Sequence, residues 1–485
     1  MLAATAAWLI AGCAAGPDFH RPSPPGAKGY TETPLPSETT SAPSIGGDAQ
    51  RFIPGRDVPA QWWTLFKSKS LDSLIRQALA DSPTLAASQA ALRQARENRL
   101  AQLGALFPAV DADFSANRSQ FTGASFGQPN RQGGLFTLYN ASVNISYTLD
   151  LFGATRRGLE ELQAQVDYQR YLLEGSYLTL ASNIVTTAIQ EGSLRSQVRA
   201  TKEILKAQEE QLALVEQQFQ LGGASRADVL AQRAQLDQTR ATLPPLEKQL
   251  SQTRHQLAVL SGKPPGDAAA LPEFELADLT LLRELPVSIP SDLVRQRPDI
   301  LAAEEQLHAA CALIGVATAN MLPKLTISGN YGSQAMAIGD LFTGGTGIWS
   351  IGAGLVQPLF RGGELTAKRR AAIAAYDQAE AQYRQTVLVA FQNVADVLRA
   401  LEQDAVALKA QADAEKSAAD SLEIARNQYE LGAVSYLTLL NAERQHQQAR
   451  LTLAQAQAAR FADTAALFQA LGGGWWNKGK QAEGK

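Results

Sequence analysis

The side chains that most often carry out chemistry are few and scattered in this sequence. It contains two cysteines and four histidines, namely Cys13, Cys311, His20, His255, His308 and His446. Their spacing matches no zinc-ligand pattern, and no Ser, His and Asp set or acid pair indicates a catalytic pocket. The glycine clusters at 344–347 and 352–354 lack the strand-to-helix context of a phosphate-binding loop. The sequence therefore predicts no enzyme, no metal site and no cofactor.

Cys13 differs from the other cysteine because it ends a short apolar run. Residues 9–13, LIAGC, resemble a bacterial lipobox, which would make Cys13 the lipidated first residue after removal of a signal peptide at 1–12. No Lys or Arg precedes the run, which departs from the usual signal pattern. The alternative is an incidental cysteine in an ordinary secretory signal. We expect a covalent lipid on Cys13, which need not be the sole membrane attachment of the chain.

Composition limits the partners that the chain can have. The 44 basic and 47 acidic residues leave a net charge of −3 over 485 residues, which gives no electrostatic reason to expect nucleic acid. Residues 13–60 are rich in Pro, Ser, Thr and Gly, which predicts a lipidated N-terminal tether or equatorial segment without a core of its own.

The rest of the chain repeats itself. Residues 219–230, FQLGGASRADVL, are matched 210 residues later by 429–440, YELGAVSYLTLL, and Pro83 is matched by Pro298 at a distance of 215. Such a constant offset indicates a tandem duplication. The predicted boundaries are a first repeat at 61–262, a connector at 263–290, a second repeat at 291–473 and a C-terminal tail at 474–485.

Each repeat has the same predicted order of elements. A helix of about 35 residues ends at a Phe-Pro or Leu-Pro pair, and two strands, a very long helix, a Leu-Gly turn and a final helix follow. The long helix at 154–219 has apolar residues seven apart and would span ~100 Å at ~1.5 Å per residue. Pro244 and Pro245 are predicted to kink or interrupt the final helix of the first repeat.

The predicted strands suggest a membrane. In 137–149, TLYNASVNISYTL, apolar and aromatic residues alternate with hydroxyls and amides that carry no charge, and similar alternation surrounds residues 110–116, 325–331 and 349–355. No apolar run of about 18 residues is evident, so a spanning segment must be a closed β-barrel. Because four strands cannot close a barrel and bacterial barrels begin at about eight, the chain must oligomerise.

With these landmarks in order, the chain resembles the outer-membrane efflux lipoproteins of the TolC family. The resemblance rests on GPDFHRP at 16–22, the corners DLFG at 150–153 and PLFRG at 358–362, YLTLLNAER at 436–444, and the paired repeats. It implies a mainly α fold with a transmembrane β-barrel. A homotrimer would form it, with four strands per chain completing a 12-stranded barrel above a 12-helix periplasmic α-barrel.

The resemblance also implies a function and partners. The protein would be the exit duct of a tripartite efflux system in the outer membrane of a Gram-negative bacterium. It would passively conduct small toxic compounds or drugs from an inner-membrane pump of the RND type through a periplasmic membrane-fusion adaptor. Outer-membrane lipid would surround its barrel.

The repeated turns would then lie at the periplasmic end of the tunnel, where an adaptor could dock. Gly222, Gly223 and Gly432 would allow the backbone conformations of a tight helix end. Ser225 and Ser435 would cap the helices that follow.

The same end would hold a constriction. Its candidate residues are Leu437, Thr438, Asn441 and Arg444. Relatives in the family often carry Asp where this chain has Thr438 and Asn441, so strong cation selectivity is not expected at this level. Asp228 in the first turn is either a remaining carboxylate of the mouth or a solvated residue of the first helical turn.

Two alternatives remain open. The same duct could serve type I protein secretion. A lipid-anchored periplasmic coiled-coil scaffold or adaptor would share the long helices, but it would not need four amphipathic strands with uncharged polar faces.

Overall fold

The computed structural model describes residues 14–24, 26, 29–122, 124, 127 and 133–478. Cys13, the predicted signal peptide at 1–12 and residues 479–485 of the predicted tail lie outside this range. The chain divides into two compact units, the first made of 1–22, 91–169 and 302–383, and the second of 23–90, 170–301 and 384–485. Each unit takes segments from both repeats, so the compact units do not coincide with the repeats.

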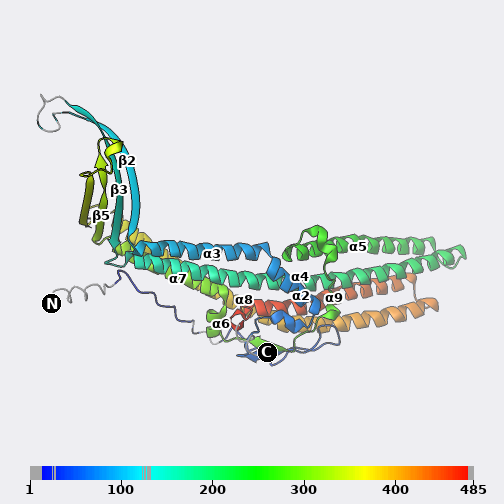
Figure 1. Cartoon of the computed structure of the whole chain (residues 1–485). Helices are drawn as coiled ribbons and strands as arrows, with labels where there is room; N and C mark the ends of the chain where they lie inside the picture. The colour runs from blue at the N-terminus through cyan, green and yellow to red at the C-terminus, as the bar shows by residue number, and fades with distance from the viewer. Residues whose placement is uncertain are drawn as a thin grey trace. The chain divides into compact units, whose positions relative to one another are not determined.

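The long helices of the two repeats match in length and spacing. α4 (Ala154–Gln220) and α8 (Glu364–Glu430) each contain 67 residues, and α5 (Arg226–Leu260) and α9 (Tyr436–Ala470) each contain 35. α8 begins 210 residues after α4, and α9 begins 210 residues after α5. The bounds of the helices therefore confirm the predicted duplication, and Figure 1 shows each long helix turning back into its shorter partner.

The helix before the strands is divided in both repeats. α2 (Lys69–Asp81) is followed by α3 (Pro83–Leu103), and α6 (Pro290–Gln296) is followed by α7 (Pro298–Ala319). The prediction of one helix of about 35 residues is wrong, because the residue before a proline disfavours helical ψ. Ser82 and Arg297 have ψ values of 120° and 126°, and each following proline occupies the first position of its helix.

Of the two effects predicted for Pro244 and Pro245, a kink or an interruption, the interruption is wrong. α5 continues through both prolines from Arg226 to Leu260. The two missing N–H groups would have bonded to the carbonyls of Arg240 and Ala241. These residues are exposed, so water can bind the freed carbonyls and the helix persists.

The four predicted strands form one antiparallel sheet in the first unit. β2 (Ala109–Phe121), β3 (Gly134–Leu149), β5 (Lys324–Ala335) and β6 (Gly347–Val356) lie in the order β2-β3-β5-β6. Figure 1 shows β2, β3 and β5 running side by side. The two outer strands, β2 and β6, each have one edge without a partner strand among the described residues.

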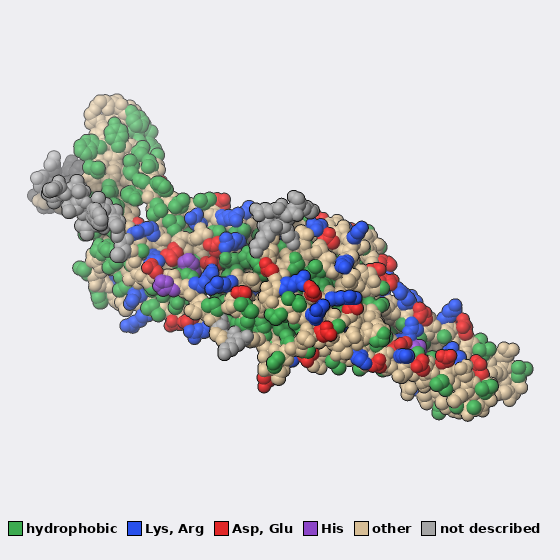
Figure 2. Space-filling view, turned by 90° about the horizontal axis from the view of Figure 1, so that it is seen from below, with side chains coloured by type: hydrophobic (Ala, Val, Ile, Leu, Met, Phe, Trp, Pro, Cys, Tyr) green, Lys and Arg blue, Asp and Glu red, His purple; other side chains and the backbone are tan. Residues whose placement is uncertain are grey.

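One face of this sheet is apolar and exposed. Val110, Tyr331, Trp349 and Ile351 expose 63%, 74%, 75% and 77% of their surface. Figure 2 shows hydrophobic side chains gathered over the strands, whereas acidic and basic side chains intermingle over the helices. Such a face is costly in water and suits lipid.

The second unit has an aromatic core that the N-terminal segment helps to enclose. Trp62 stacks on Phe468 with ring centroids 5.2 Å apart, and both are buried. β1 (Arg51–Pro54) pairs in parallel with β4 (Glu284–Val287) of the connector. Gln50 is fully buried and donates from Nε2 to the Leu282 carbonyl at 2.8 Å. This part of residues 13–60 therefore packs against the second unit, in keeping with the second of the two predicted alternatives, an equatorial segment.

One helix in the described part of the chain, α7, is long and apolar enough to cross a membrane by length and composition alone. α7 is still no uninterrupted apolar run of about 18 residues, because Glu304, Glu305 and His308 lie within it. Of its most apolar stretch, 56% is buried within the protein, as in the core helix of a folded unit.

Candidate functional site

The candidate site consists of the two turns that join α4 to α5 and α8 to α9, both in the second unit. In the first turn, Gly222 N donates to the Phe219 carbonyl and Gly223 N to the Gln218 carbonyl, at 3.0 and 2.8 Å. The second turn repeats this pattern 210 residues later, from Gly432 N and Ala433 N. Both turns are Schellman motifs, in which the residue after the helix takes a left-handed conformation.

The three predicted glycines differ in backbone conformation. Gly222 and Gly432 have φ values of +79° and +71°, a region that other residues enter at a cost. Gly223 is not among the residues with positive φ, and a Cβ on it would meet only the Gln218 carbonyl oxygen at 3.6 Å. The prediction that Gly223 supplies special backbone freedom is therefore wrong, because Gly222 alone takes the left-handed position.

The caps predicted for the following helices are confirmed. Ser225 Oγ accepts a hydrogen bond from Asp228 N, while Asp228 Oδ2 accepts from Ser225 N at 2.9 Å, which completes a capping box. Ser435 Oγ accepts from Thr438 N at 3.3 Å, but Thr438 has no carboxylate to return the bond. Asp228 thus completes a cap in the first helical turn, and its role as a carboxylate of the tunnel mouth stays a prediction.

A small core lies beneath the turns and joins the two hairpins. Its buried members are Val215, Ala425, Tyr436, Leu439 and Ala442, with Ala224, Val229, Leu422 and Tyr429 packed against them. The Tyr429 and Tyr436 rings have centroids 5.4 Å apart. This packing fixes the turns relative to each other within the second unit.

Two tyrosine hydroxyls add polar links between the hairpins. Tyr436 donates to Gln232 Oε1, which joins α9 to α5, and Tyr429 donates to Gln218 Oε1 at 3.1 Å, which joins α8 to α4. Burial raises the pKa of the Tyr436 hydroxyl well above its usual range, so this donor keeps its proton.

The four candidate constriction residues lie on one side of α9. Leu437, Thr438, Asn441 and Arg444 are all exposed, while Tyr436, Leu439 and Ala442 between them are buried. The exposed positions follow helical spacing, so they form a continuous stripe beside the second turn. The stripe carries one charge, that of Arg444.

The sequence did not single out several polar groups of this region. Gln232 lies 204 residues from Tyr436, and Glu443 holds a buried carboxylate oxygen without a hydrogen-bond partner. Burial raises the pKa of Glu443. In the sequence, Gln232 and Glu443 look like ordinary polar residues of a helix. Their burial depends on contacts between distant parts of the chain, which the sequence does not show.

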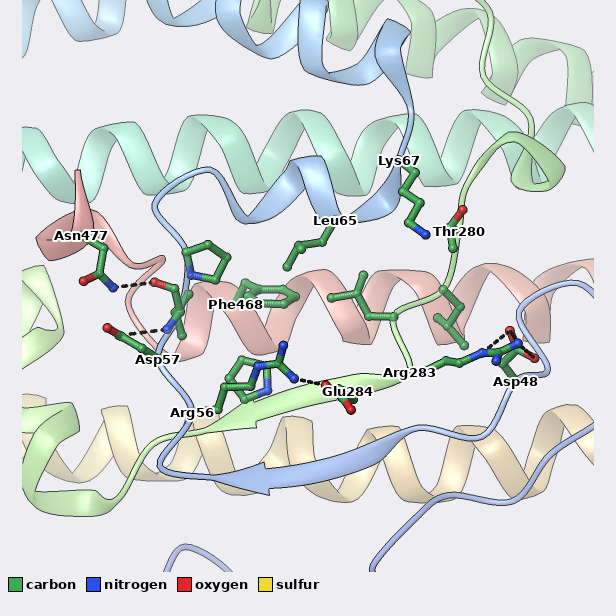
Figure 3. A pocket seen from close by; sticks show the side chains of 15 residues that line it. Asp48, Arg56, Asp57, Leu65, Lys67, Thr280, Arg283, Glu284, Phe468 and Asn477 are labelled. Atoms are coloured by element: carbon green, nitrogen blue, oxygen red, sulfur yellow. Dashed lines mark hydrogen bonds and ion pairs between the residues drawn. The ribbon is translucent and has the colours of Figure 1, made fainter. Parts of the chain in front are cut away.

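The second unit contains a cavity of ≈ 870 Å³. Figure 3 shows two ion pairs among its lining residues, Arg56 with Glu284 and Arg283 with Asp48. Its floor includes the buried Phe468. Most of its charges thus neutralise one another, and no group of three or more His, Cys, Asp or Glu among the described residues could hold a metal ion. We assign no reaction to this cavity.

In a comparison with known families, one family model matches both repeats of the chain. A model described as "Outer membrane efflux protein" matches residues 74–263 and 289–473. These two stretches follow the predicted repeats and leave out most of the connector between them.

Individual relatives match over nearly the whole chain. The pyoverdine export outer membrane protein OpmQ of Pseudomonas putida is 32% identical over 91% of this chain and 94% of its own length. The probable efflux pump outer membrane protein TtgC of Pseudomonas putida is 30% identical over 99% of this chain and 96% of its own. The solved outer-membrane channel OprN is 28% identical with a TM-score of 0.85, covering 96% of this chain and 100% of that channel.

Proposed function

Because this chain belongs to the outer membrane efflux protein family, we propose that it is the exit duct of a tripartite efflux system. Its fold is that of TolC-family channels, and it is an outer-membrane component of efflux. In the proposal, the duct passively conducts small toxic compounds or drugs that an inner-membrane RND-type pump delivers through a periplasmic adaptor. The duct uses no cofactor and catalyses no reaction.

The observation that carries the proposal is the open sheet. β2 and β6 leave two edges unpaired, and the apolar face is exposed along all four strands. Open sheet edges are not tolerated in lipid. Three copies would pair each β6 with the β2 of the next copy and close a barrel of about twelve strands, within the range of bacterial barrels.

The duplication supports the same assembly. Leu151 and Phe152, where β3 leads into α4, are partly buried, and the Phe152 carbonyl accepts a hydrogen bond from Ala15 N. The corresponding Leu359 and Phe360, between β6 and α8, expose 92% and 89% of their surface. We attribute the difference to the missing neighbour, because the next copy would cover the second corner.

The paired turns are the proposed adaptor contact. In three chains they form a ring of about six exposed turns of one geometry, which suits a repeating partner. Gly222, Ser225 and Asp228 shape the first turn, and Gly432 and Ser435 shape the second. The exposed stripe of Leu437, Thr438, Asn441 and Arg444 is the proposed constriction of the tunnel beside them.

Cargo and membrane attachment complete the proposal. The names of relatives refer to pyoverdine export and to efflux of toluene and antibiotics, which favours small molecules over secreted proteins as the cargo of this chain. A lipid on Cys13 would add a second attachment to the outer membrane. A coiled-coil scaffold offers no reason for the exposed apolar face of the sheet.

Native mass spectrometry of the particle extracted from outer membranes tests the assembly. We expect three chains, each with acyl mass on Cys13. Three chains without that mass would refute the lipid and keep the duct. A monomer would refute the duct and favour the scaffold.

A second experiment tests the docking role of the turns. Gly222→Val and Gly432→Val force a branched side chain into a left-handed position, so we expect weaker cross-linking to the adaptor and less efflux. Gly223→Ala is the matched control, because its φ is ordinary and its Cβ has room. Normal efflux and unchanged cross-linking in trimers of both valine variants would refute the docking role.

A further inference from the structure

The polar face of the sheet carries charge at one place. Along β2, Val110, Ala112 and Phe114 share the apolar face, and Asp111 and Asp113 therefore point to the opposite face. The prediction that all four strands have uncharged polar faces is therefore wrong for β2. β2 differs, and neither of its carboxylates takes part in an ion pair in the part of the chain that the structure describes.

The strand register aligns these carboxylates with an ordered polar row. Asp111 lies opposite Asn144 of β3, Asn144 lies opposite Asn330 of β5, and Asn330 lies opposite Ser350 of β6. Asn330 Nδ2 donates to Asn144 Oδ1 at 2.6 Å, which holds the two amides across the strands. One row of side chains thus crosses the whole sheet at the level of Asp111.

Basic side chains are absent from this level among the described residues of the four strands. Arg118 follows Val110 by an even number of residues, so it lies on the apolar face. Lys324 shares the polar face, but it lies six residues along β5 from Asn330, or ~20 Å. That distance exceeds the Debye length of ~8 Å at physiological ionic strength, so Lys324 cannot neutralise the row.

We propose that Asp111 and Asp113 determine the charge preference of the duct by making one band of its lumen negative. The proposal rests on the proposed trimer, in which the polar face lines the lumen and two carboxylates per chain form two layers ~7 Å apart. The band acts through its field on passing solutes and requires no bound ion. The constriction stripe cannot supply this preference, because Thr438 and Asn441 are uncharged and Arg444 is positive.

The test measures the local potential through the reactivity of an introduced thiol. Ser350→Cys places the thiol on β6 in the row of Asp111, where Ser350 is exposed. Trimers purified in detergent are treated with a cationic trimethylammonium methanethiosulfonate and, separately, with an anionic sulfonate analogue. The ratio of the two rates reports the potential whether or not the far end of the tunnel is open. Cys311 is buried, and protein without the introduced thiol supplies its background.

We expect the cationic reagent to react faster than the anionic one. In the double variant Asp111→Asn, Asp113→Asn, the ratio of the cationic to the anionic rate should fall at least about threefold. The asparagines keep the shape of the side chains, and each single variant should give part of the change. A second thiol, Ser417→Cys on exposed α8, is the control and should keep its ratio. If the asparagine substitutions leave the rate ratio at Ser350→Cys unchanged in intact trimers, the charge role of the carboxylates is overturned and the duct stands. The same holds if the ratio at Ser417→Cys changes equally. A monomeric particle would overturn both the charge role and the duct.

Discussion

Arg460 on α9 offers the sharpest test of how the N-terminal segment is held in the second unit. Its side chain is fully buried. It donates to the Leu401 carbonyl of α8 at 2.8 Å, to Thr39 Oγ1 at 3.2 Å and to the Asp48 carbonyl at 3.4 Å. Burial lowers the pKa of Arg460 to about 10, which leaves it charged at neutral pH. One cation therefore links the segment from Thr39 to Asp48 to both helices.

Arg460→Met removes the charge and its hydrogen bonds while keeping most of the volume. Removing one partner of a buried charge network costs about 3–5 kcal/mol, because the carbonyls and the neighbouring Asp404 and Asp463 lose their compensation. Arg450→Met on the same helix is the control. Its ion pair to Glu203 is 2.7 Å long and partly exposed, so its loss should cost about 0–1 kcal/mol.

Hydrogen exchange of the purified protein, read by mass spectrometry, measures the effect directly. We expect amides from Thr39 to Arg51 to exchange faster in Arg460→Met, since the segment loses two of its hydrogen bonds to α9. The melting temperature should fall further than in Arg450→Met. Equal exchange and equal melting temperatures in the two variants would show that Arg460 does not anchor the segment.

Three further outcomes follow from the contacts. Burial raises the pKa of Asp463 to about 7, so its stabilising protonation is complete below the unfolded pKa of ~3.9 and is lost as pH rises through about 7. Asp463→Asn should flatten the fall in melting temperature between about pH 4 and 7, and an unchanged fall over that range would contradict this. Tyr436→Phe leaves Gln232 Oε1 without its donor and should cost about 1–3 kcal/mol in thermal unfolding. Ser225→Ala should cost about 1 kcal/mol, because it opens the capping box.

The periodic and repeated parts of the fold were predictable from sequence. The long helix was predicted at 154–219 and is observed at Ala154–Gln220, because heptad spacing and the Leu-Gly turn are local signals. The four strands and the serine caps were likewise local patterns. The errors at Ser82, Arg297 and Pro244 came from proline, whose effect depends on position and exposure.

The tertiary contacts could not be predicted. Gln50 reaches Thr464 across 414 residues, and Tyr436 reaches Gln232 across 204. Nothing in a Pro- and Ser-rich stretch distinguishes a buried Gln50 from a solvated one, since its burial depends on partners elsewhere in the chain. The charge at Asp111 and its face followed from the alternation along β2, but its alignment with Asn144 and Asn330 became clear only with the strand register.

The two repeats share a backbone plan but have diverged in their surfaces. α7 is largely buried, whereas its counterpart α3 is largely exposed, and the first turn closes a capping box that the second leaves open at Thr438. A single chain with equal repeats would have no reason for such differences. In an assembly of copies, each repeat has one neighbour inside its chain and one in the next, so the two interfaces are free to diverge. In the proposed trimer, we therefore expect the next copies to cover the surfaces of α3, of the corner at Leu359 and of the edges of β2 and β6.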